Sequence, residues 1–294
     1  MVVSLSAMSV TISPNELAHR IHTGKKQTIL ASFWEPGEGM SYRKFCSEHI
    51  PTSLFCDPAA SLTSVPSSKN GRNPLPDEET LRRAFAKWGI RDEYDVVVYD
   101  QTNSLFAARA WWILKWAGVD NAYILNGGMA NWEREGHKIV GGPGNIHAQA
   151  TRVPSLGHMP VATLEDVKKG DRILIDTREP SRFAGRKEHL DLKAGHIPGA
   201  VNVPTRFLMT PEKLFLSPEE VRDQFAQVGI GEEEAKNAIV YSGSGLHGSL
   251  GIALMHHAGL PGAAVYMGGW SQWTASGNNP VERGGERTRE SMSR

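Results

Sequence analysis

Two copies of one motif decide the fold that the sequence predicts: Tyr123-Ile124-Leu125-Asn126-Gly127-Gly128 and Val265-Tyr266-Met267-Gly268-Gly269. Each copy follows an Ala-Gly pair at the same distance, because Gly127 lies nine positions after Gly118 and Gly268 lies nine positions after Gly259. A tryptophan follows each copy, at positions 132 and 273. Such self-similarity indicates a chain built from two structural copies.

The similarity extends toward the N-terminal side of both motifs. An apolar run and then a helical stretch precede each copy, and the two runs span 96–99 and 238–241. Further upstream, His49-Ile50-Pro51 corresponds to His196-Ile197-Pro198, and the strand-like run 28–33 corresponds to 172–176. Short apolar runs alternating with helical segments such as 77–88 and 217–228 are typical of βαβ units. We therefore predict an α/β fold of two tandem domains, each a small parallel sheet flanked by helices.

The length of the chain agrees with this division. At about 150 residues per domain, 294 residues favour two domains. We place the N-terminal domain at residues 8–139 and the C-terminal domain at residues 160–282. The segment 140–159 contains Gly141-Gly142-Pro143-Gly144 and lacks periodicity, which predicts a linker. The charged stretch 283–294 is predicted to be a disordered tail.

Composition and charge exclude several classes of function. Hydrophobic residues make up 40% and charged residues 22% of the chain, as in an ordinary globular protein. Because 32 basic residues balance 32 acidic ones, we expect neither a nucleic-acid nor a membrane partner. The most apolar helical stretch, 107–119, is too short to span a bilayer, and residues 1–10 lack the features of a secretory signal. The sequence therefore predicts a cytoplasmic protein with Cys46 and Cys56 as reduced thiols.

The loop that follows the run 238–241 is the candidate for chemistry. It reads Ser242-Gly243-Ser244-Gly245-Leu246-His247-Gly248, and a helix is predicted from about Ser249 to Ala258. In parallel sheets, ligands bind beyond the C-terminal ends of the strands, where helix N-termini present unpaired N–H groups. Glycines let successive N–H groups converge on one anion. We interpret the loop as an anion-binding nest, with a plain strand-to-helix turn as the structural alternative.

Other motifs fit this loop less well. The run 243–248 matches the glycine fingerprint of dinucleotide sites, but the next apolar run, 264–267, ends without an acidic residue to hold a ribose. A phosphatase-type loop needs a cysteine and a closing arginine, and a hydrolase elbow needs a glycine two positions to either side of its serine. The loop meets neither requirement. His256 and His257 are adjacent on the predicted helix, so they do not share one face as metal ligands would.

Five stretches of the second half resemble a known family when they are taken together: Asp176-Thr177-Arg178-Glu179, Ser181-Arg182-Phe183-Ala184-Gly185, Gly195-His196-Ile197-Pro198-Gly199-Ala200-Val201-Asn202-Val203-Pro204, the loop 241–247 and Gly268-Gly269-Trp270-Ser271-Gln272-Trp273. Over about residues 10–282 the chain resembles the two-domain rhodanese-type sulfurtransferases, which include the thiosulfate and 3-mercaptopyruvate sulfurtransferases. The resemblance implies two tandem rhodanese domains and no cofactor. It also implies that the N-terminal copy is non-catalytic, which fits Asp100 at its loop position.

The resemblance implies a sulfurtransferase whose C-terminal loop carries a cysteine. That cysteine takes a sulfane sulfur from thiosulfate or 3-mercaptopyruvate as a persulfide and passes it to cyanide or a thiol. A helix N-terminus lowers the pKa of such a thiol from about 8.5 to about 3.5–7.5, so that it is ionised and nucleophilic. The matching residue here is Ser242, which has no sulfur to load. We therefore expect the chain as sequenced to be inactive in persulfide chemistry.

Two explanations of Ser242 stay open. Either the natural protein lacks the cysteine and is an inactive homologue with an anion-binding or regulatory role, or the residue was changed to trap a state. In the mercaptopyruvate branch, an aspartate and a histidine of the N-terminal domain assist the loop serine, whereas Ala59 and Asn73 occupy those positions here. The sixth loop residue is His247 in place of threonine. These departures together favour natural divergence over a single engineered change.

The predicted binding site combines the loop with two arginines. The resemblance places Arg182 as a substrate-binding arginine and makes Arg186 the candidate for a second one, because guanidinium groups pair with carboxylate and sulfate-like oxyanions. The loop residues that complete this site are Gly243, Ser244, Gly245, Leu246 and His247. Expected partners are a small-molecule sulfur donor and acceptor or another oxyanion, with a thiol-bearing protein as an alternative acceptor.

Three further side chains have a structural interpretation. We expect Arg178 to pair with a structural carboxylate. Trp270 is assigned equally to the pocket wall and to the core. Cys56 is a candidate for a surrogate thiol at the cleft, but the sequence favours a plain reduced cysteine.

Overall fold

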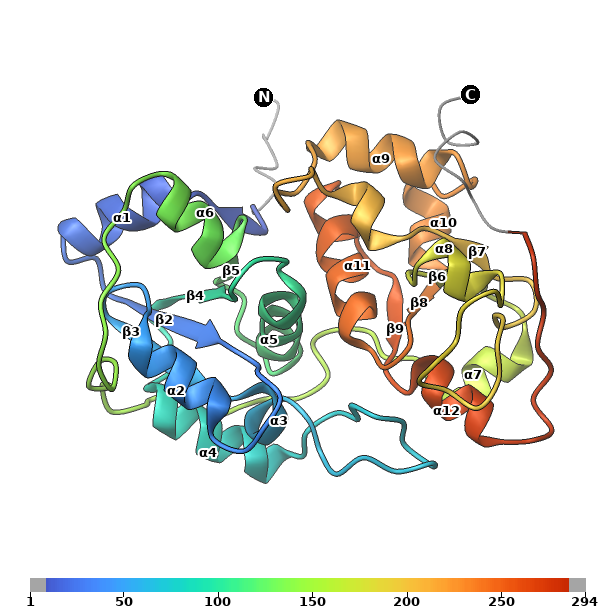
Figure 1. Ribbon diagram of the computed structural model, residues 1–294, viewed down its shortest axis with the longest axis horizontal. Coiled ribbons are helices and arrows are strands. Elements are labelled where there is room, and N and C mark those ends of the chain that lie inside the picture. The colour runs from blue at the N-terminus through green and yellow to red at the C-terminus, as the bar shows by residue number, and fades with distance from the viewer. Residues whose placement is uncertain (1–8, 286–294) are drawn as a thin grey trace, which may run out of the picture.

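The N-terminal half of the repeat forms a parallel five-stranded sheet with helices packed against it (Figure 1). The computed structural model describes residues 9–285. The strand order is β1-β5-β4-β2-β3, where β1 is Thr11–Ile12, β2 is Gln27–Ser32, β3 is Ser53–Cys56, β4 is Asp95–Tyr99 and β5 is Ala122–Leu125. The helices are α1 (Pro14–His22), α2 (Met40–Ser47), α3 (Pro58–Ser61), α4 (Glu78–Trp88), α5 (Leu105–Trp116) and α6 (Gly128–Arg134).

The C-terminal half forms a parallel four-stranded sheet of the same kind. Its strand order is β7-β6-β8-β9, where β6 is Ile173–Asp176, β7 is Val201–Asn202, β8 is Ala238–Tyr241 and β9 is Ala264–Tyr266. Its helices are α7 (Leu164–Lys169), α8 (Pro180–Phe183), the 3-10 helix η1 (Thr205–Leu208), α9 (Pro218–Ala226), α10 (Glu232–Lys236), α11 (Leu246–His257) and α12 (Gly269–Ala275). The predicted fold class, two tandem α/β domains with small parallel sheets, is confirmed.

The repeated sequence motifs make repeated contacts. The hydroxyl of Tyr99, the last residue of β4, accepts a hydrogen bond from the Ile50 amide at 3.0 Å. In the second copy the Tyr241 hydroxyl, at the end of β8, accepts one from the Ile197 amide at 3.2 Å. The His-Ile-Pro stretch of each half is thus fixed to its central strand. Because these tyrosines are fully buried, each hydroxyl needs such a partner.

The local sequence explains where the predicted helices begin. Asp77 caps α4 by accepting from the Thr80 amide at 2.7 Å, and Ser217 begins α9 with a capping box to Glu220. Helix α11 begins at Leu246 and not at Ser249, because Gly245 adopts φ +83° and turns the chain into the helix three residues earlier. Strands β1 and β7 have only two residues each, which is too short for an alternating or continuous apolar pattern to be recognised in the sequence.

The two domains share a core. Helices α5 and α11 lie side by side where the domains meet (Figure 1), and the buried apolar residues of both belong to one cluster. Both helices are apolar around most of their circumference, as expected of helices buried on all sides. Trp111, Trp112 and Trp116 are buried in this cluster. The domains are therefore held by hydrophobic packing in addition to the chain that joins them.

The segment 140–159 runs along the N-terminal domain. Val140 pairs with His49 in an antiparallel bridge, and the amides of Asn145 and Ser155 donate to the carbonyls of Ser53 and Ala117. Of the predicted tail 283–294, residues 286–294 lie outside the described part of the chain. Within residues 9–285, every helix is too short or too polar to cross a bilayer.

Candidate functional site

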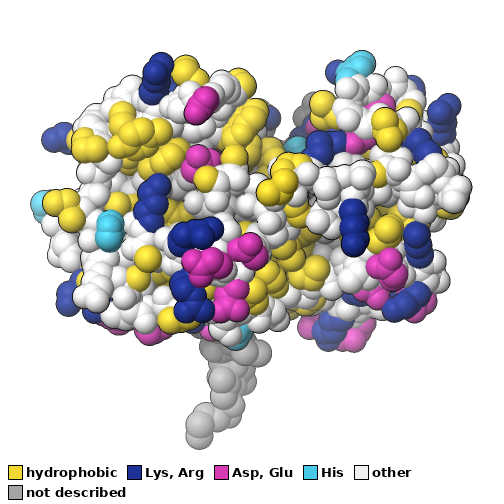
Figure 2. Space-filling view, turned by 90° about the horizontal axis from the view of Figure 1, so that it is seen from below, with side chains coloured by type: hydrophobic (Ala, Val, Ile, Leu, Met, Phe, Trp, Pro, Cys, Tyr) yellow, Lys and Arg dark blue, Asp and Glu magenta, His cyan; other side chains and the backbone are white. Residues whose placement is uncertain are grey.

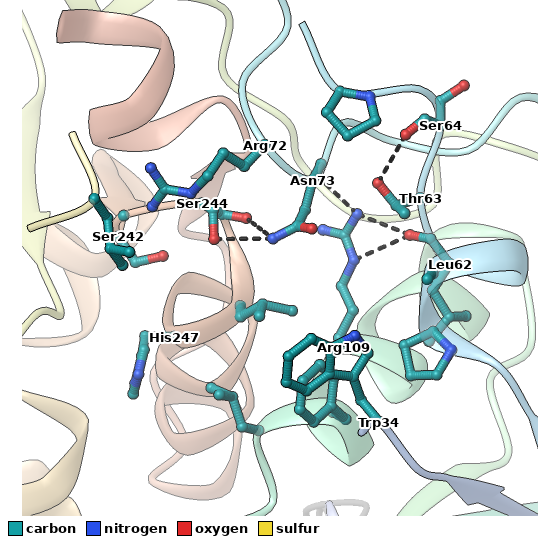
Figure 3. A pocket seen from close by; sticks show the side chains of 18 of the residues that line it. Trp34, Leu62, Thr63, Ser64, Arg72, Asn73, Arg109, Ser242, Ser244 and His247 are labelled. Atoms are coloured by element: carbon teal, nitrogen blue, oxygen red, sulfur yellow. Dashed lines mark hydrogen bonds between the residues drawn. The ribbon is translucent and has the colours of Figure 1, made fainter. Parts of the chain in front are cut away.

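A cavity of about 880 Å³ lies between the two domains, and both contribute to its wall. Figure 2 shows hydrophobic side chains gathered where the two lobes of the molecule meet. The cavity opens at the C-terminal end of β8, where Ser242 begins the loop, and it reaches Trp34, which follows β2 (Figure 3). The cavity thus lies at the C-terminal ends of parallel strands, which is where the sequence analysis places the candidate site.

The loop 242–245 brings the Ser242 side chain to the start of α11. Ser242 is 1% exposed, and its Oγ accepts a hydrogen bond from the Gly245 amide at 3.0 Å. The first α-helical hydrogen bond runs from the Ser249 amide to the Gly245 carbonyl. The amides of Leu246, His247 and Gly248 precede it and so have no acceptor within the α-helix. They form the positive end of the helix dipole next to Ser242.

The Gly268-Gly269 pair supports this loop because the amides that follow it donate to the loop carbonyls. The Trp270 amide donates to the Ser242 carbonyl at 2.8 Å, and the Ser271 amide donates to the Gly243 carbonyl at 2.9 Å. Gly269 has φ +55°, and a Cβ there would lie 2.3 Å from the Ser242 carbonyl oxygen. Only glycine fits so close an approach. The repeated glycine motif is therefore a support for the loop.

The N-terminal copy has the same support but a different loop content. The Met129 amide donates to the Asp100 carbonyl at 2.9 Å, and Gly128 has φ +57°. The Asp100 carboxylate points into its own loop, where Oδ1 accepts from the Ser104 amide at 3.0 Å and Oδ2 accepts from the amides of Phe106 and Ala107 at 3.0 and 3.2 Å. Burial raises the pKa of Asp100, and these amides oppose that rise. The amides at the start of α5 therefore donate to a carboxylate of the same loop, that of Asp100.

Three arginines surround the loop of the C-terminal domain. A Cβ at Gly243 would lie 3.1 Å from Nη2 of Arg72, 3.3 Å from Nη1 of Arg182 and 3.9 Å from Cδ of Arg178. Arg178 and Arg182 follow β6 in the C-terminal domain, whereas Arg72 lies in the N-terminal domain, on the segment between α3 and α4. The Arg72 amide donates to Ser271 Oγ of the C-terminal domain at 3.2 Å. Gly243 is therefore the point where cationic groups of both domains converge.

Acidic side chains neutralise these arginines. Nη2 of Arg182 donates to both carboxylate oxygens of Glu188, at 2.7 and 2.8 Å, and to Asp191 at 3.0 Å. Asp191 also pairs with Arg72. Burial opposes the ionisation of Glu188, but Arg182 and the loop amides outweigh it, so the pKa of this carboxyl is lowered. Arg182 thus lines the cavity, and its guanidinium is hydrogen-bonded to these carboxylates.

The other three side chains that the sequence analysis singled out, Arg178, Trp270 and Arg186, have different places in the structure. Arg178 pairs with Asp176 at 2.7 Å, the structural carboxylate that we expected, and it lies over the Trp270 ring at 4.6 Å. Trp270 is fully buried, and its Nε1 donates to the Lys193 carbonyl, so it belongs to the core. Arg186 is not among the residues that line the cavity. The chain turns back after α8, and the Arg186 amide donates to the Ser181 carbonyl.

Of the loop residues, Gly243, Ser244, Leu246 and His247 line the cavity, and Gly245 forms the turn beneath them. Asn73 lies beside Ser244, to whose Oγ its Nδ2 donates at 2.9 Å (Figure 3). Ala59 also lines the cavity. Asn73 offers an N–H donor and does not accept the hydroxyl proton in this arrangement, so it does not activate Ser244 as a nucleophile.

His247 is half-buried beside the loop and hydrogen-bonded to a threonine. Its Nδ1 lies 2.8 Å from Thr205 Oγ1. Burial and the nearby Arg182 lower the pKa of His247 to about 4. The imidazole is therefore neutral at pH 7.

Sequence reasoning placed Ala59 and Asn73 of the N-terminal domain near the loop but missed Arg109. Arg109 on α5 is buried, and its Nε and Nη2 donate to the carbonyls of Leu62, Asn73 and Pro74 (Figure 3). Burial lowers the pKa of Arg109 to about 9. Its place inside an apolar helical stretch was the available signal, since an arginine in such a stretch must find partners.

Neither cysteine takes the place of a thiol at the loop. Cys56 lies in β3 and is fully buried, and this burial raises its pKa to about 12. Cys46 lies on α2, and neither residue lines the cavity. Across residues 9–285 no three His, Cys, Asp or Glu side chains are grouped so that they could hold a metal ion.

Comparisons with known proteins agree with this geometry. The family described as "Rhodanese-like domain" matches residues 13–135 and 160–276. The Mycobacterium tuberculosis protein SseB, provisionally named a thiosulfate sulfurtransferase, is 33% identical over 281 residues, covering 94% of this chain and 97% of its own. A Pseudomonas aeruginosa protein, provisionally named a 3-mercaptopyruvate sulfurtransferase, is 33% identical over 250 residues, covering 82% and 87%.

A solved structure shows the same arrangement of both domains. The 3-mercaptopyruvate sulfurtransferase from Leishmania major superimposes with a TM-score of 0.79 at 26% identity, covering 91% of this chain and 74% of that one. The two regions that match the family description include strands β2 to β9 and the loop between β8 and α11. The chain therefore belongs to the rhodanese family and carries two rhodanese-like domains in tandem.

Proposed function

We propose that the chain binds a small sulfur-containing oxyanion at the loop 242–247 and the arginines around it. We further propose that Ser242 occupies the position of the sulfur-carrying cysteine of the family. As sequenced, the protein then holds the anion without forming a persulfide. This makes it an anion-binding member of the sulfurtransferase family, and the anion is its ligand rather than its sulfur source.

The carboxylate of Asp100 is the observation that carries this proposal. In the N-terminal loop, one carboxylate oxygen accepts from the amides of Phe106 and Ala107, the second and third residues of α5. The corresponding amides of α11 belong to His247 and Gly248. Because Ser242 is shorter than aspartate and carries no charge, it leaves these two donors for an anion that comes from solution.

The charge around the loop supports the same ligand. Arg72 and Arg182 come within contact distance of the Gly243 position, and Arg178 lies next to them. In Arg178, Nη1 is buried without a hydrogen-bond partner among the described residues. Guanidinium groups bind carboxylate and sulfate-like oxygens in two-point contacts, so an entering oxyanion finds charge and donors together.

The available nucleophiles support the absence of a covalent step. A serine hydroxyl needs a base to be activated, and the nearest titratable loop side chain, His247, has its Nδ1 engaged by Thr205. Ser244 accepts a hydrogen bond from Asn73, which leaves it without a base. Neither cysteine lines the cavity.

The relatives favour sulfur transfer as a second candidate function. Proteins at 33% identity over most of the chain are named thiosulfate and 3-mercaptopyruvate sulfurtransferases. A cysteine at position 242 would place its Sγ where the Gly245 amide and the helix dipole stabilise a thiolate. That function requires a small-molecule donor, with cyanide, a small thiol or a thiol-bearing protein as the acceptor.

Calorimetry and intact-mass analysis test the proposal together. We expect thiosulfate and sulfate to bind, and we expect the protein mass to stay unchanged after incubation with thiosulfate or 3-mercaptopyruvate and desalting. Arg182→Ala should weaken anion binding by about tenfold, because a charge-assisted contact contributes about 1.5–3 kcal/mol before solvent screening. Arg91→Ala is the matched control, since Arg91 pairs with Glu93 away from the cavity. A gain of one sulfur on the peptide that contains Ser242, reversed by a reductant, would disprove the proposal.

A further inference from the structure

The ion pairs around the loop 242–247 balance the charge of the three arginines that approach it. Each of these guanidinium groups is paired with a carboxylate of the C-terminal domain. The pairs are Arg72–Asp191, Arg178–Asp176, Arg182–Glu188 and Arg182–Asp191. Three positive charges thus meet three negative ones. An anion that binds at the loop finds hydrogen-bond donors in these arginines but no positive charge in excess.

The two remaining acidic side chains of the cavity wall are compensated by other groups. Glu179 pairs with Arg206 at 3.0 Å. Asp77 is exposed, and its carboxylate caps α4 by accepting from the Thr80 amide. Water and the positive end of that helix therefore stabilise its charge. The one charged residue of the cavity wall that is then left is Arg109.

Arg109 has no acidic partner among residues 9–285. Its side chain is 1% exposed, and its Nε and Nη2 donate to the uncharged carbonyls of Leu62, Asn73 and Pro74. Burial lowers its pKa to about 9, and no carboxylate opposes that shift. A buried charge without an opposite charge is unfavourable, and an anion bound nearby would remove part of that penalty.

The Arg109 guanidinium lies next to the turn of the loop 242–247. A Cβ at Gly245 would lie 3.4 Å from its Nη1, and this Nη1 also contacts the Met267 sulfur. The Gly245 amide is the group that donates to Ser242 Oγ. Figure 3 shows the guanidinium beside Asn73, although Arg109 belongs to α5 of the other domain. A charge buried at this place acts through protein and not through water, which strengthens its field.

The hydrogen bonds of Arg109 also give it a positioning role. They hold the segment 62–74, on which Arg72 and Asn73 reach the loop. Carbonyl groups need N–H donors, however, and not a whole charge. Arginines are seldom fully buried unless an opposite charge pairs with them. Positioning therefore explains the donors of Arg109 but not its lack of a carboxylate partner.

We infer that Arg109 supplies the net positive charge of the anion site and acts on the bound anion through its field, from the other domain. The N-terminal copy thereby takes part in binding, although Asp100 fills its own loop. This inference rests on the proposed anion site and names the residue that sets its charge preference. Since the Coulomb energy is proportional to the charge of the ligand, Arg109 favours dianions over monoanions.

Calorimetry with sulfate and methanesulfonate at low salt tests this assignment. Arg109→Gln removes the charge and keeps an amide donor for the carbonyls. We expect the affinity to fall about tenfold for methanesulfonate and about a hundredfold for sulfate, because a dianion loses twice the Coulomb energy of a monoanion. Arg109→Lys keeps the charge and should hold both affinities within about threefold of the unmodified chain. Arg91→Gln, which removes an arginine paired with Glu93 away from the cavity, should change neither.

The outcomes separate this inference from the proposal on which it rests. If neither anion binds the unmodified chain, the anion site itself is wrong. If both bind, equal fold losses in Arg109→Gln would mean that Arg109 only positions the segment 62–74, and unchanged affinities would remove it from the site. Either result overturns the inference, because misplacement of a segment does not scale with the charge of the ligand.

A measurement on the unmodified chain decides the question if Arg109→Gln does not fold. The ¹⁵Nε signal of Arg109 can be identified by its absence from the spectrum of Arg109→Lys. We expect saturation with sulfate to shift this signal, and saturation with methanesulfonate to shift it less. A signal that stays in place when sulfate is bound would overturn the inference, since the anion would then lie outside the field of Arg109.

Discussion

The loops before α5 and α11 share their support but differ in what fills them. In both, a glycine at positive φ, Gly128 or Gly269, lets the following amides donate to the loop carbonyls. The last loop residue before each helix is in the left-handed region, Ser104 at φ +57° and Gly245 at φ +83°. The N-terminal loop is one residue longer between strand and helix, and Asp100 places a carboxylate against three of its amides. The C-terminal loop offers only the Ser242 hydroxyl to the Gly245 amide.

The two loops therefore differ in whether the amides at the start of the helix have an acceptor within the chain. A buried donor must find an acceptor, and in the N-terminal domain the chain itself supplies it. In the C-terminal domain the acidic groups lie farther out, where Glu188 and Asp191 hold Arg182 and leave the amides of α11 uncovered. Under the proposed function, the same loop architecture stabilises the N-terminal copy and binds an anion in the C-terminal copy.

A cysteine placed in each loop in turn is the strongest test of this comparison. In Ser242→Cys, the thiolate attacks the outer sulfur of thiosulfate, the S–S bond breaks, and sulfite leaves with the electron pair. We expect sulfur transfer to cyanide at least about a thousandfold above the unmodified chain, because adding the nucleophile restores the covalent step. Thiosulfate should be the better donor, since Ala59 and Asn73 provide no acid or base for a ketoacid.

The matched variant for this experiment is Asp100→Cys. Asp100 does not line the cavity, so a cysteine there has no access to the donor. We expect no gain of sulfur at the peptide that contains position 100. Equal sulfur loading of the two variants would show that the two loops do not differ in access, and full turnover of 3-mercaptopyruvate by Ser242→Cys would show that Ala59 and Asn73 do not matter.

Asp100→Ala tests the stabilising role of the N-terminal loop. The substitution leaves the amides of Ser104, Phe106 and Ala107 without their acceptor in a buried place. We expect the free energy of unfolding to fall by about 3 kcal/mol, measured by denaturant titration. Ser242→Ala, which removes a single acceptor, should cost about 1 kcal/mol. Equal losses would contradict the idea that only the N-terminal loop is filled.

The sequence predicted the features that lie within one motif. The repeat could be found because each copy is a contiguous motif, and the pairing of Arg178 with a structural carboxylate could be expected because its partner, Asp176, lies two positions away. The partners of Arg182 were missed, since Glu188 and Asp191 lie in a stretch without periodicity. Arg72 and Trp34 were missed for a different reason. They enter the cavity only because the domains pack against each other, and no local pattern records that contact.

The pH dependence of stability should also differ between the two copies. His247 on α11 corresponds to Phe106 on α5, and burial lowers the pKa of His247 to about 4 from an ordinary value of about 6.5. A depressed histidine pKa means that protons bind the unfolded chain more readily, so stability is complete above pH 6.5 and is lost as the pH falls toward 4. His256 adds to the same loss, because burial lowers its pKa to about 4 as well.

His247→Gln isolates the contribution of His247 to the loss of unfolding free energy at low pH. Between pH 7.5 and pH 5 we expect the unmodified chain to lose about 2 kcal/mol more unfolding free energy than this variant, at 1.36 kcal/mol per pH unit in the linked range. His147→Gln changes an exposed histidine of the segment 140–159 and serves as the control. Parallel pH profiles of His247→Gln and the unmodified chain would place the acid-sensitive group elsewhere.

Asp191→Asn tests the smallest difference between the copies, the position of their acidic groups. Asp191 pairs with Arg72 of one domain and Arg182 of the other, so it competes with an entering anion for both. Its neutralisation should raise the affinity for sulfate about threefold to tenfold at low salt, and the gain should shrink as the ionic strength rises. Asp92→Asn, which removes an exposed carboxylate paired with Arg152, should change nothing. A weaker affinity in Asp191→Asn would mean that the carboxylate positions the arginines for the anion and does not compete with it.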